Sequence, residues 1–468
     1  MKFYLATTLF IHSLLSFTLS VNAAEPLFDM EAIRDVSTLE VEVIEDWHLV
    51  KGRTPSRQKL ITIKVGEIWP GQDYRMPVRF VVPVEGKANG FHLTGGNQPQ
   101  RLKQDTHVSN VDAILLERGI GQVQTIIQVL QASGLGELGK ESEERFARSL
   151  NPRDKIQYWA WPATMMRAIT AAHDETDHFN PGKVAMSGGS KNGATPSLAI
   201  LHDERMTGVF ATVSPIWDSP LRLCDRAAWD SLIADYGPMT HSFLGGHYGP
   251  VFNRQALKAG RSWEDLQRFT AAVSDGVFIS RNLEALLSRK VDLFFEPGSH
   301  DFVAFDLAWG GAHYPDIPLY IGANTGHGIK DRHPGIERDA NNRTAFLLNH
   351  FFDEVTPMLP VPNIATELSN GSLSVHTSFP NEESAESARL FWIVNRPSDG
   401  SPGYIKELIP HENWSEMESR DGAWQASIPL PHDATHIDVF ANHEKTISYR
   451  GTHLSTWIST PYTRVILK

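Results

Sequence analysis

The sequence predicts an α/β protein with a mostly parallel sheet, followed by a smaller all-β domain. Between residues 91 and 321, short apolar runs that suit buried strands alternate with helix-like segments. Strands that alternate with helices form a parallel sheet with helices on both faces. Beyond residue 357 this pattern gives way to short alternating runs separated by turn residues, which is typical of a β-sandwich.

The individual elements are placed along the chain by their apolar patterns. Residues 41–66 and 76–84 are rich in β-forming side chains, and Asp73 and Pro77 interrupt them, which suits antiparallel edge strands. Further strands are predicted at residues 91–93, 113–116, 184–186, 208–213, 291–295 and 319–321, and helices at residues 123–131, 163–173, 195–202 and 336–355.

Composition and charge argue against several kinds of partner. The 468 residues carry a formal net charge of -12 and no dense run of Lys and Arg, which disfavours nucleic acid and anionic membranes. Gly134-Leu-Gly136-Glu-Leu-Gly139 matches the dinucleotide fingerprint, but a helix-like segment precedes it rather than a strand. His173-Asp-Glu-Thr-Asp-His178 is interpreted as a solvated helix end rather than a metal site. We therefore expect no cofactor and no metal.

The first residues have the features of a signal peptide. Lys2 supplies a positive charge, an interrupted apolar stretch follows, and the small residues Ala23 and Ala24 suit cleavage. We expect residues 1–23 to be removed, which predicts a secreted or periplasmic protein without a stable membrane anchor. Cys224 is the only cysteine, so no intramolecular disulfide can form, and we expect a buried thiol there.

A serine lies where a predicted strand turns into a predicted helix. The segment Lys183-Val-Ala-Met-Ser-Gly-Gly-Ser-Lys-Asn-Gly193 runs from an apolar strand through a Gly-rich turn around Ser190 into a helix of small residues. This is the pattern of a nucleophile elbow, a strained turn that lifts the serine Oγ above the sheet. The usual pattern has Gly two residues after the serine, whereas here Asn192 takes that place. A structural Gly-rich turn is the alternative; the Walker spacing of a phosphate loop does not fit.

An acid and a histidine follow in the chain order of the α/β-hydrolase fold, which is serine, acid, histidine. Asp301 ends a turn after one predicted strand, and His327 lies between glycines after the next. In this arrangement His327 takes the proton of Ser190, and Asp301 orients the imidazolium. His300 and Asp306 are the nearest competitors, and His300 is interpreted as a neighbour rather than a base. The sequence therefore predicts an α/β-hydrolase fold with Ser190, Asp301 and His327 as its triad.

Two segments are candidates for the oxyanion site. The backbone N–H of Lys191, directly after the serine, points at the developing oxyanion in an elbow of this kind. A second donor normally comes from the loop after an earlier strand, where Gly95, Gly96 and Asn97 follow a short apolar run. An ordinary turn is the alternative interpretation of that loop.

The order of these motifs defines the expected domains. Residues 24–356 hold all three predicted triad positions and form the predicted hydrolase domain. Within them, residues 220–290 contain helix-like segments but no obvious strand, so we expect an insertion that caps the site. Residues 357–468, which begin with a Pro-rich linker, form the predicted β-sandwich, an accessory domain without a catalytic group. The expected cap is rich in aromatic side chains, namely Trp229, Tyr236, Tyr248, Phe252 and Trp263.

Motifs between residues 155 and 330 carry a family resemblance. A helix before the elbow contains Trp161-Pro162 and Met165-Met-Arg-Ala168, and the elbow reads Ser190-Lys-Asn-Gly193. The acid loop reads Gly298-Ser-His-Asp301, and the histidine loop reads Asn324-Thr-Gly-His-Gly328. In these motifs the chain resembles the PhoPQ-activated pathogenicity-related family of α/β hydrolases, which implies the same fold and the same triad.

The chain departs from that family at two positions that bear on substrate preference. Asn192 stands where the family has Arg, and His300 stands where it has Asn. The elbow is also similar to that of glucuronoyl esterases, in which a basic residue follows the serine and assists near the oxyanion. That similarity implies that Lys191 meets an anionic or carbonyl oxygen of the substrate.

The motifs and the resemblance together predict a secreted serine hydrolase. We expect a carboxylic-ester hydrolase with an acyl-Ser190 intermediate, acting on a small-molecule or carbohydrate-linked ester. A serine peptidase for short peptides is the first alternative, because this fold also hosts prolyl-type peptidases. A secreted binding or signalling protein on an inactive scaffold is the second, and the intact Ser190, Asp301 and His327 argue against it.

Overall fold

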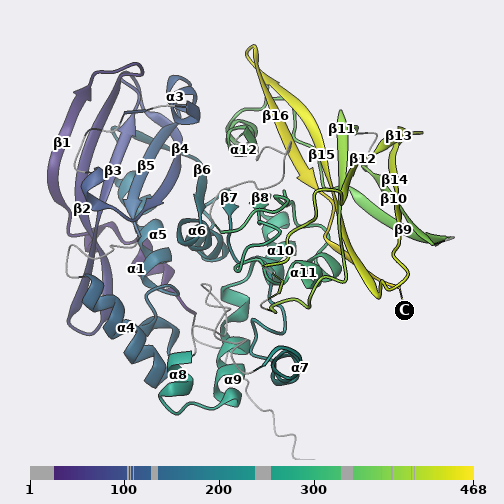
Figure 1. Ribbon diagram of the computed structural model, residues 1–468. Helices are drawn as coiled ribbons and strands as arrows, with labels where there is room; N and C mark the ends of the chain where they lie inside the picture. Colours follow the sequence, from purple (N-terminus) through teal and green to yellow (C-terminus); the bar gives the residue numbers. More distant parts are fainter. Residues whose placement is uncertain are drawn as a thin grey trace, which may run out of the picture.

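An eight-stranded sheet forms the N-terminal part of the protein in a computed structural model (Figure 1). Its strands are β1 (Glu42–Val50), β2 (Ser56–Trp69), β3 (Gln72–Val82), β4 (Ala88–Gly96), β5 (Gly121–Ile126), β6 (Phe179–Gly189), β7 (Gly208–Thr212) and β8 (Asp292–Glu296). They lie in the order β1-β2-β3-β5-β4-β6-β7-β8. The first three strands pair antiparallel, and the five from β5 to β8 are parallel. Beyond β8, parallel bridges at Leu319 and Gly322 extend the sheet.

The structure describes residues 26–467 except for residues 103, 104, 106, 109, 128–134, 238–253, 328–340, 370, 381, 382, 402 and 405. The predicted signal peptide, residues 1–23, lies outside this range, as do Tyr248 and Phe252 of the expected cap and the first part of the helix predicted from residue 336. Among the described residues, no helix combines the length and the apolar character needed to cross a membrane.

Helices cover both faces of the sheet. They are α1 (Met30–Arg34), α2 (Pro99–Leu102), α3 (Asn110–Glu117), α4 (Leu135–Ser149), α5 (Ala160–Asp174), α6 (Lys191–His202), α7 (Arg226–Tyr236), α8 (Arg254–Lys258), α9 (Trp263–Val273), α10 (Ile279–Ser288), α11 (Leu307–His313) and α12 (Asn341–Phe351). Successive side chains of a strand point to opposite faces. Accordingly, Val184 and Met186 of β6 pack in one core cluster with α5 and α6, and Ala185 packs in another with α3 and α12. Because the order of strands and helices places a strand-to-helix turn after β6, the predicted α/β-hydrolase fold is confirmed.

Two of the predicted elements were wrong in type. Residues 113–116, predicted as a strand, lie in helix α3, and residues 123–126, predicted as the start of a helix over 123–131, belong to β5. In α3 the buried residues Val111, Leu115 and Leu116 recur at helical spacing. β5 lies between β3 and β4 and is buried on both faces, so its sequence shows no alternation that would mark it as a strand.

The C-terminal part is a sandwich of two antiparallel sheets. Its strands are β9 (Asn363–Ser369), β10 (Ser372–Ser378), β11 (Ser387–Val394), β12 (Trp414–Glu416), β13 (Glu418–Arg420), β14 (Ala423–Pro429), β15 (His436–Tyr449), β16 (Thr452–Ser459) and β17 (Thr463–Ile466). One sheet has the order β13-β14-β10-β9, and the other has the order β12-β11-β15-β16 with β17 paired to β15. Apolar side chains from both sheets form a separate core between them.

A second apolar core lies between the sandwich and the part of the protein that precedes it, which consists of the eight-stranded sheet and its helices. Ile447 of β15 and Leu454 and Ile458 of β16 pack in the same cluster as α12, and α12 lies beside β16 in Figure 1. The backbone N–H of Ser459 also donates to the carbonyl oxygen of Leu319 at 2.7 Å. The two parts are therefore joined by a packed interface and not only by the linker after residue 357.

Candidate active site

The turn between β6 and α6 holds Ser190 in a strained conformation. Its φ of 56° and ψ of -125° lie in a region that non-glycine residues rarely adopt, and its N–H donates to the Thr212 carbonyl at 2.9 Å. A Cβ on Gly188 would lie 2.1 Å from the Asn192 carbonyl oxygen, and one on Gly193 would lie 2.8 Å from the Gly188 carbonyl oxygen. Only glycine fits at these two positions. In this elbow the required glycine after the serine is therefore Gly193, three residues on, and not residue 192.

Ser190, His327 and Asp301 form one hydrogen-bonded chain. Ser190 Oγ lies 2.8 Å from His327 Nε2, and His327 Nδ1 lies 3.0 and 3.2 Å from the two oxygens of Asp301. Asp301 is fully buried, and its Oδ1 also accepts the N–H of Val303 at 2.8 Å. The Phe302 ring packs against the imidazole with centroids 4.5 Å apart. Because a carboxylate only accepts, Nδ1 carries the proton, and Nε2 is left to accept the serine hydroxyl.

Neither Asp306 nor His300 takes part in the hydrogen bonds that join Ser190, His327 and Asp301. Asp306 is buried in a bidentate ion pair with Arg222, at 2.6 Å from Nε and 2.8 Å from Nη2. Both ring nitrogens of His300 are engaged elsewhere, since Nε2 donates to the Glu407 carbonyl at 2.6 Å and Nδ1 accepts the Ser299 hydroxyl at 2.7 Å. The structure thus brings together the predicted three residues and excludes the two nearest substitutes.

A second Ser–His–Asp arrangement lies inside the sheet, and the sequence analysis missed it. Ser187 Oγ is 2.8 Å from His92 Nε2, and His92 Nδ1 is 2.7 Å from Asp112 Oδ1. Ser187 and His92 are only 2% and 1% exposed, whereas Ser190 is half-buried at the end of the strand. These three residues come from β6, β4 and α3, so no spacing in the sequence signals them. Accessibility and the strained turn, not hydrogen-bond geometry, distinguish Ser190 from Ser187.

The predicted oxyanion loop lies against the elbow and borders a polar pocket. A Cβ on Gly95 would lie 3.2 Å from Asn192 Oδ1, so the two segments touch. Gly96, Asn97 and Asn192 help to line a pocket of about 540 Å³. The side-chain oxygens of Asn97 and Asn192 are buried and have no hydrogen-bond partner in the described part of the chain. Other polar residues of the lining are Thr94, Gln98, Arg101, Asp105, His107, Gln124 and Thr125.

Lys191 begins helix α6 directly after the serine. The first backbone N–H groups of a helix have no partner within the helix and point outward from its positive end. Burial lowers the pKa of the Lys191 ammonium group. Both properties suit a residue beside a site where negative charge develops.

Trp229 and Trp263 of the expected cap pack in an apolar cluster with the loop that carries Asp301. Trp229 of α7 is buried against Leu221, Leu232 and Phe305, and its indole N–H donates to the Leu221 carbonyl at 3.0 Å. Trp263 packs against Trp229 with ring centroids 5.8 Å apart. These side chains therefore hold α7 against the loop that carries Asp301, and they do not line the polar pocket.

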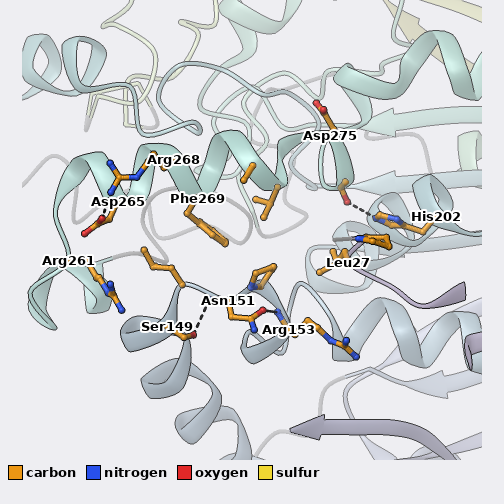
Figure 2. Close-up of a pocket in the computed structure, with 16 residues that line it drawn as sticks. Leu27, Ser149, Asn151, Arg153, His202, Arg261, Asp265, Arg268, Phe269 and Asp275 are labelled. Carbon is orange, nitrogen blue, oxygen red and sulfur yellow. Dashed lines mark hydrogen bonds and ion pairs between the residues drawn. The ribbon is translucent and has the colours of Figure 1, made fainter. Parts of the chain in front are cut away.

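A further pocket lies away from the triad. It measures about 880 Å³ and is bordered by α9, the loop after α4 and His202, as Figure 2 shows. His202 ends α6, whereas Ser190 precedes its first residue, so the two lie at opposite ends of a helix about 18 Å long. None of the predicted site residues lines this pocket.

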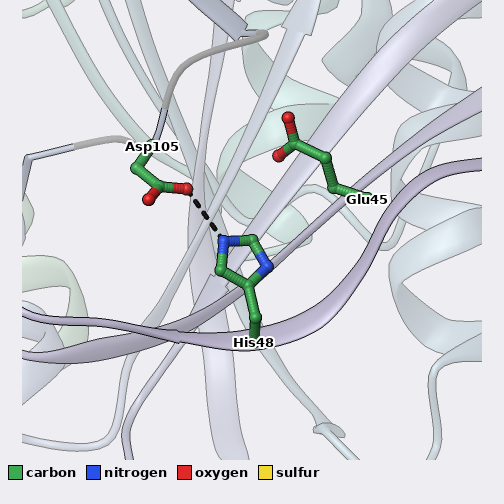
Figure 3. Close-up of side chains that lie close together, drawn as sticks. All are labelled: Glu45, His48 and Asp105. Atoms are coloured by element: carbon green, nitrogen blue, oxygen red, sulfur yellow. Dashed lines mark hydrogen bonds and ion pairs between the residues drawn. The ribbon is translucent and has the colours of Figure 1, made fainter.

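One group of three metal-ligating side chains meets among the described residues, namely Glu45, His48 and Asp105 (Figure 3). His48 Nδ1 donates to the Asp46 carbonyl at 2.8 Å, and Nε2 pairs with Asp105 at 2.8 Å. The hydrogen bond to Asp105 raises the pKa of this imidazole. Arg79, which is buried, pairs with Glu45 at 2.8 Å. Two cationic groups thus face two carboxylates, and this donor set suits an ion-pair cluster better than a metal ion.

Comparisons with known proteins show no family for this chain. No family model and no curated protein matches the chain, so the resemblance to the PhoPQ-activated family stays a prediction. Acetyl xylan esterase 1 from Thermoanaerobacterium sp. is 12% identical, with a TM-score of 0.38, over 65% of this chain and 88% of its own. A glucuronoyl esterase from Teredinibacter turnerae is 14% identical, with a TM-score of 0.35, over 56% of this chain and 61% of its own. A puromycin-hydrolyzing peptidase from Mycobacterium tuberculosis is 15% identical, with a TM-score of 0.33, over 63% of this chain and 39% of its own. Similarity at this level carries no argument about activity.

Proposed function

We propose that the protein is a serine hydrolase that cleaves a carboxylic ester through an acyl-Ser190 intermediate. The observation that carries the proposal is the continuous chain of hydrogen bonds from Ser190 through His327 to the buried Asp301. A serine hydroxyl is a poor nucleophile unless a base lies within hydrogen-bond reach, and His327 Nε2 lies 2.8 Å away.

The residues would act in two steps. Ser190 Oγ attacks the ester carbonyl carbon while its proton passes to His327 Nε2, and Asp301 stabilises the imidazolium. The tetrahedral intermediate then expels the alcohol, which takes the proton from His327 and leaves the acyl group on Ser190. Water repeats the sequence, with His327 again as base, and the acid leaves as the serine regains its proton.

Negative charge on the carbonyl oxygen would be stabilised by backbone donors. Lys191 at the start of α6 supplies one N–H, and Gly95, Gly96 and Asn97 supply candidates for the other. Pre-oriented donors of this kind are worth about 10²- to 10³-fold in kcat each.

The pocket beside the elbow favours a small polar ester over a lipid. Its lining includes the polar side chains of Asn97, Gln98, Arg101 and Asn192. A substrate with hydroxyl groups can hydrogen-bond to such side chains, whereas an alkyl chain would leave polar groups without a partner at a cost of about 1–3 kcal/mol each. The proposed signal peptide, residues 1–23, would place this activity outside the cytoplasm.

The proposal is tested by labelling with a fluorophosphonate, with Ser187→Ala as the matched control for Ser190→Ala. Wild type and Ser187→Ala should be labelled, and Ser190→Ala should not. Lys183 and Lys191 enclose both serines in one tryptic peptide, so the fragment spectrum must place the label.

Hydrolysis is measured in parallel on p-nitrophenyl esters, aryl-carbohydrate esters and aminoacyl p-nitroanilides. Esters should be cleaved and the amides should not; the reverse preference would favour a peptidase. An unlabelled wild type, or undiminished hydrolysis by Ser190→Ala, would contradict the proposal and favour an inactive scaffold or another nucleophile.

A further inference from the structure

The loop that carries Asp301 is tied to a segment of the sandwich, residues 396–409, which we call the strap. His300 donates to the carbonyl of Glu407 in the strap at 2.6 Å, and the buried Arg396 donates from Nη2 to the carbonyl of Ser299. Further along the same loop, the Phe305 carbonyl accepts the N–H of strap residue 400 at 3.0 Å. The strap thus contacts the acid loop on both sides of Asp301.

The loop that carries His327 is tied to the same strap through Asn324. The Asn324 side chain accepts the N–H of Ile409 at 2.7 Å and donates to its carbonyl at 2.9 Å. Asn324 is buried and has a φ of 56°, which places its side chain in this position at the cost of a left-handed backbone. Both hydrogen bonds are therefore made by one side chain three residues before His327.

The two loops are also tied to each other behind the triad. The N–H of Asn324 donates to Ser299 Oγ at 2.8 Å, and that hydroxyl donates to His300 Nδ1 at 2.7 Å. The N–H of His300 donates to the Thr325 carbonyl at 3.0 Å. One buried network therefore runs from the base loop through Ser299 and His300 to the strap.

We propose that the strap positions the catalytic acid and base, with Asn324, His300 and Arg396 as positioning residues. The inference rests on the proposed function and deepens it, because it makes the sandwich a structural part of the active site. The hydrogen bond from His327 to Asp301 is 3.0 Å long, so a movement of about 1 Å between their loops breaks it. A misplacement of that size costs about 10²-fold in rate.

Asn342 offers a matched control for a substitution of Asn324. It is buried at the start of α12, and its side chain makes the same pair of bonds to the sandwich: it accepts the N–H of Trp457 at 2.8 Å and donates to its carbonyl at 3.1 Å. Its amide also donates to Glu296 Oε1 at 3.0 Å, at the end of β8, so Asn342→Ala removes one bond more than Asn324→Ala and is the stricter control. Both asparagines thus join the hydrolase part to the sandwich through one residue's backbone, but only Asn324 lies in a triad loop. A loss of general stability should affect both variants alike.

The test compares Asn324→Ala with Asn342→Ala in the full-length protein. We expect similar falls in the melting temperature of both. We expect kcat for a p-nitrophenyl ester to fall about 10²-fold in Asn324→Ala alone, with KM changed less than about twofold, because the substrate pocket is untouched. The isosteric Asn324→Asp, which still accepts the N–H of Ile409, should recover part of kcat and serves as the test if Asn324→Ala does not fold.

The outcomes separate this inference from the proposed function. If wild type is labelled at Ser190 but Asn324→Ala and Asn324→Asp keep the kcat of Asn342→Ala, the strap has no positioning role and the inference alone is wrong. If wild type is not labelled at Ser190, the proposed function itself fails.

Discussion

At Gly298 the backbone of the acid loop lies close against the backbone of the histidine loop. A Cβ added there would lie 2.3 Å from the carbonyl oxygen of Thr325, and 3.3 Å from that of Gly326. Ordinary contacts of a Cβ begin near 3.4 Å, so Gly298→Ala must separate the two backbones by about 1 Å. The atoms that the added methyl group would meet are backbone atoms of Thr325 and Gly326, so no flexible side chain can move away to relieve the clash.

That separation should lengthen the hydrogen bond between His327 and Asp301. Gly298 lies three residues before Asp301, and Thr325 lies two residues before His327, so the two loops carry the displacement to the hydrogen bond between them. At 3.0 Å this bond has little room to lengthen before it is lost. We expect kcat/KM to fall about 10²-fold and the free energy of unfolding to fall by about 1–3 kcal/mol, the usual range for overpacking.

The assay is ester hydrolysis together with urea unfolding, with Gly52→Ala as the control. A Cβ on Gly52 meets no atom closer than 3.9 Å, from the side chain of His107, so this variant should behave as wild type. If Gly298→Ala keeps wild-type kcat/KM, the close approach of the two loops does not position His327, and the reasoning from backbone contact is refuted.

Two further predictions concern pH and substrate. Burial raises the pKa of Asp399 from 3.8 to about 7, so its contribution to stability is fully present below pH 3.8 and is lost as the pH rises through about 7. The loss is at most about 1.4 kcal/mol per pH unit. Urea unfolding at pH 5 and pH 8 should show a smaller difference in Asp399→Asn than in wild type; an equal difference would contradict the assignment. Because the pocket lined by Asn192 and the loop after β4 is polar, kcat/KM for p-nitrophenyl acetate should exceed that for the octanoate by roughly tenfold or more; a preference for octanoate would show that an apolar site receives the acyl group.

The sequence alone was sufficient wherever the signal is local. The elbow is a strand, a Gly-rich turn and a helix within a single stretch of chain, and the closest contacts that require Gly188 and Gly193 lie inside that stretch. The chain order of Ser190, Asp301 and His327 follows the topology of the fold, so their meeting could be predicted from the strands that precede them. The alternating runs after residue 357 likewise predicted the antiparallel sheets.

Tertiary structure decided what depends on neighbours distant in sequence. Residues 113–116 are a short apolar run that suits helix or strand equally, and residues 121–126 include two glutamines and a threonine, so only the place of β5 between two other strands selects its conformation. The same holds for the contrast between Ser187 and Ser190, because burial and backbone strain, which no spacing records, separate two similar hydrogen-bond chains. The strap could not be predicted for the same physical reason: its bonds to the acid and base loops pair side chains with backbone groups distant in sequence, and these partners are set by how the sandwich packs against the sheet.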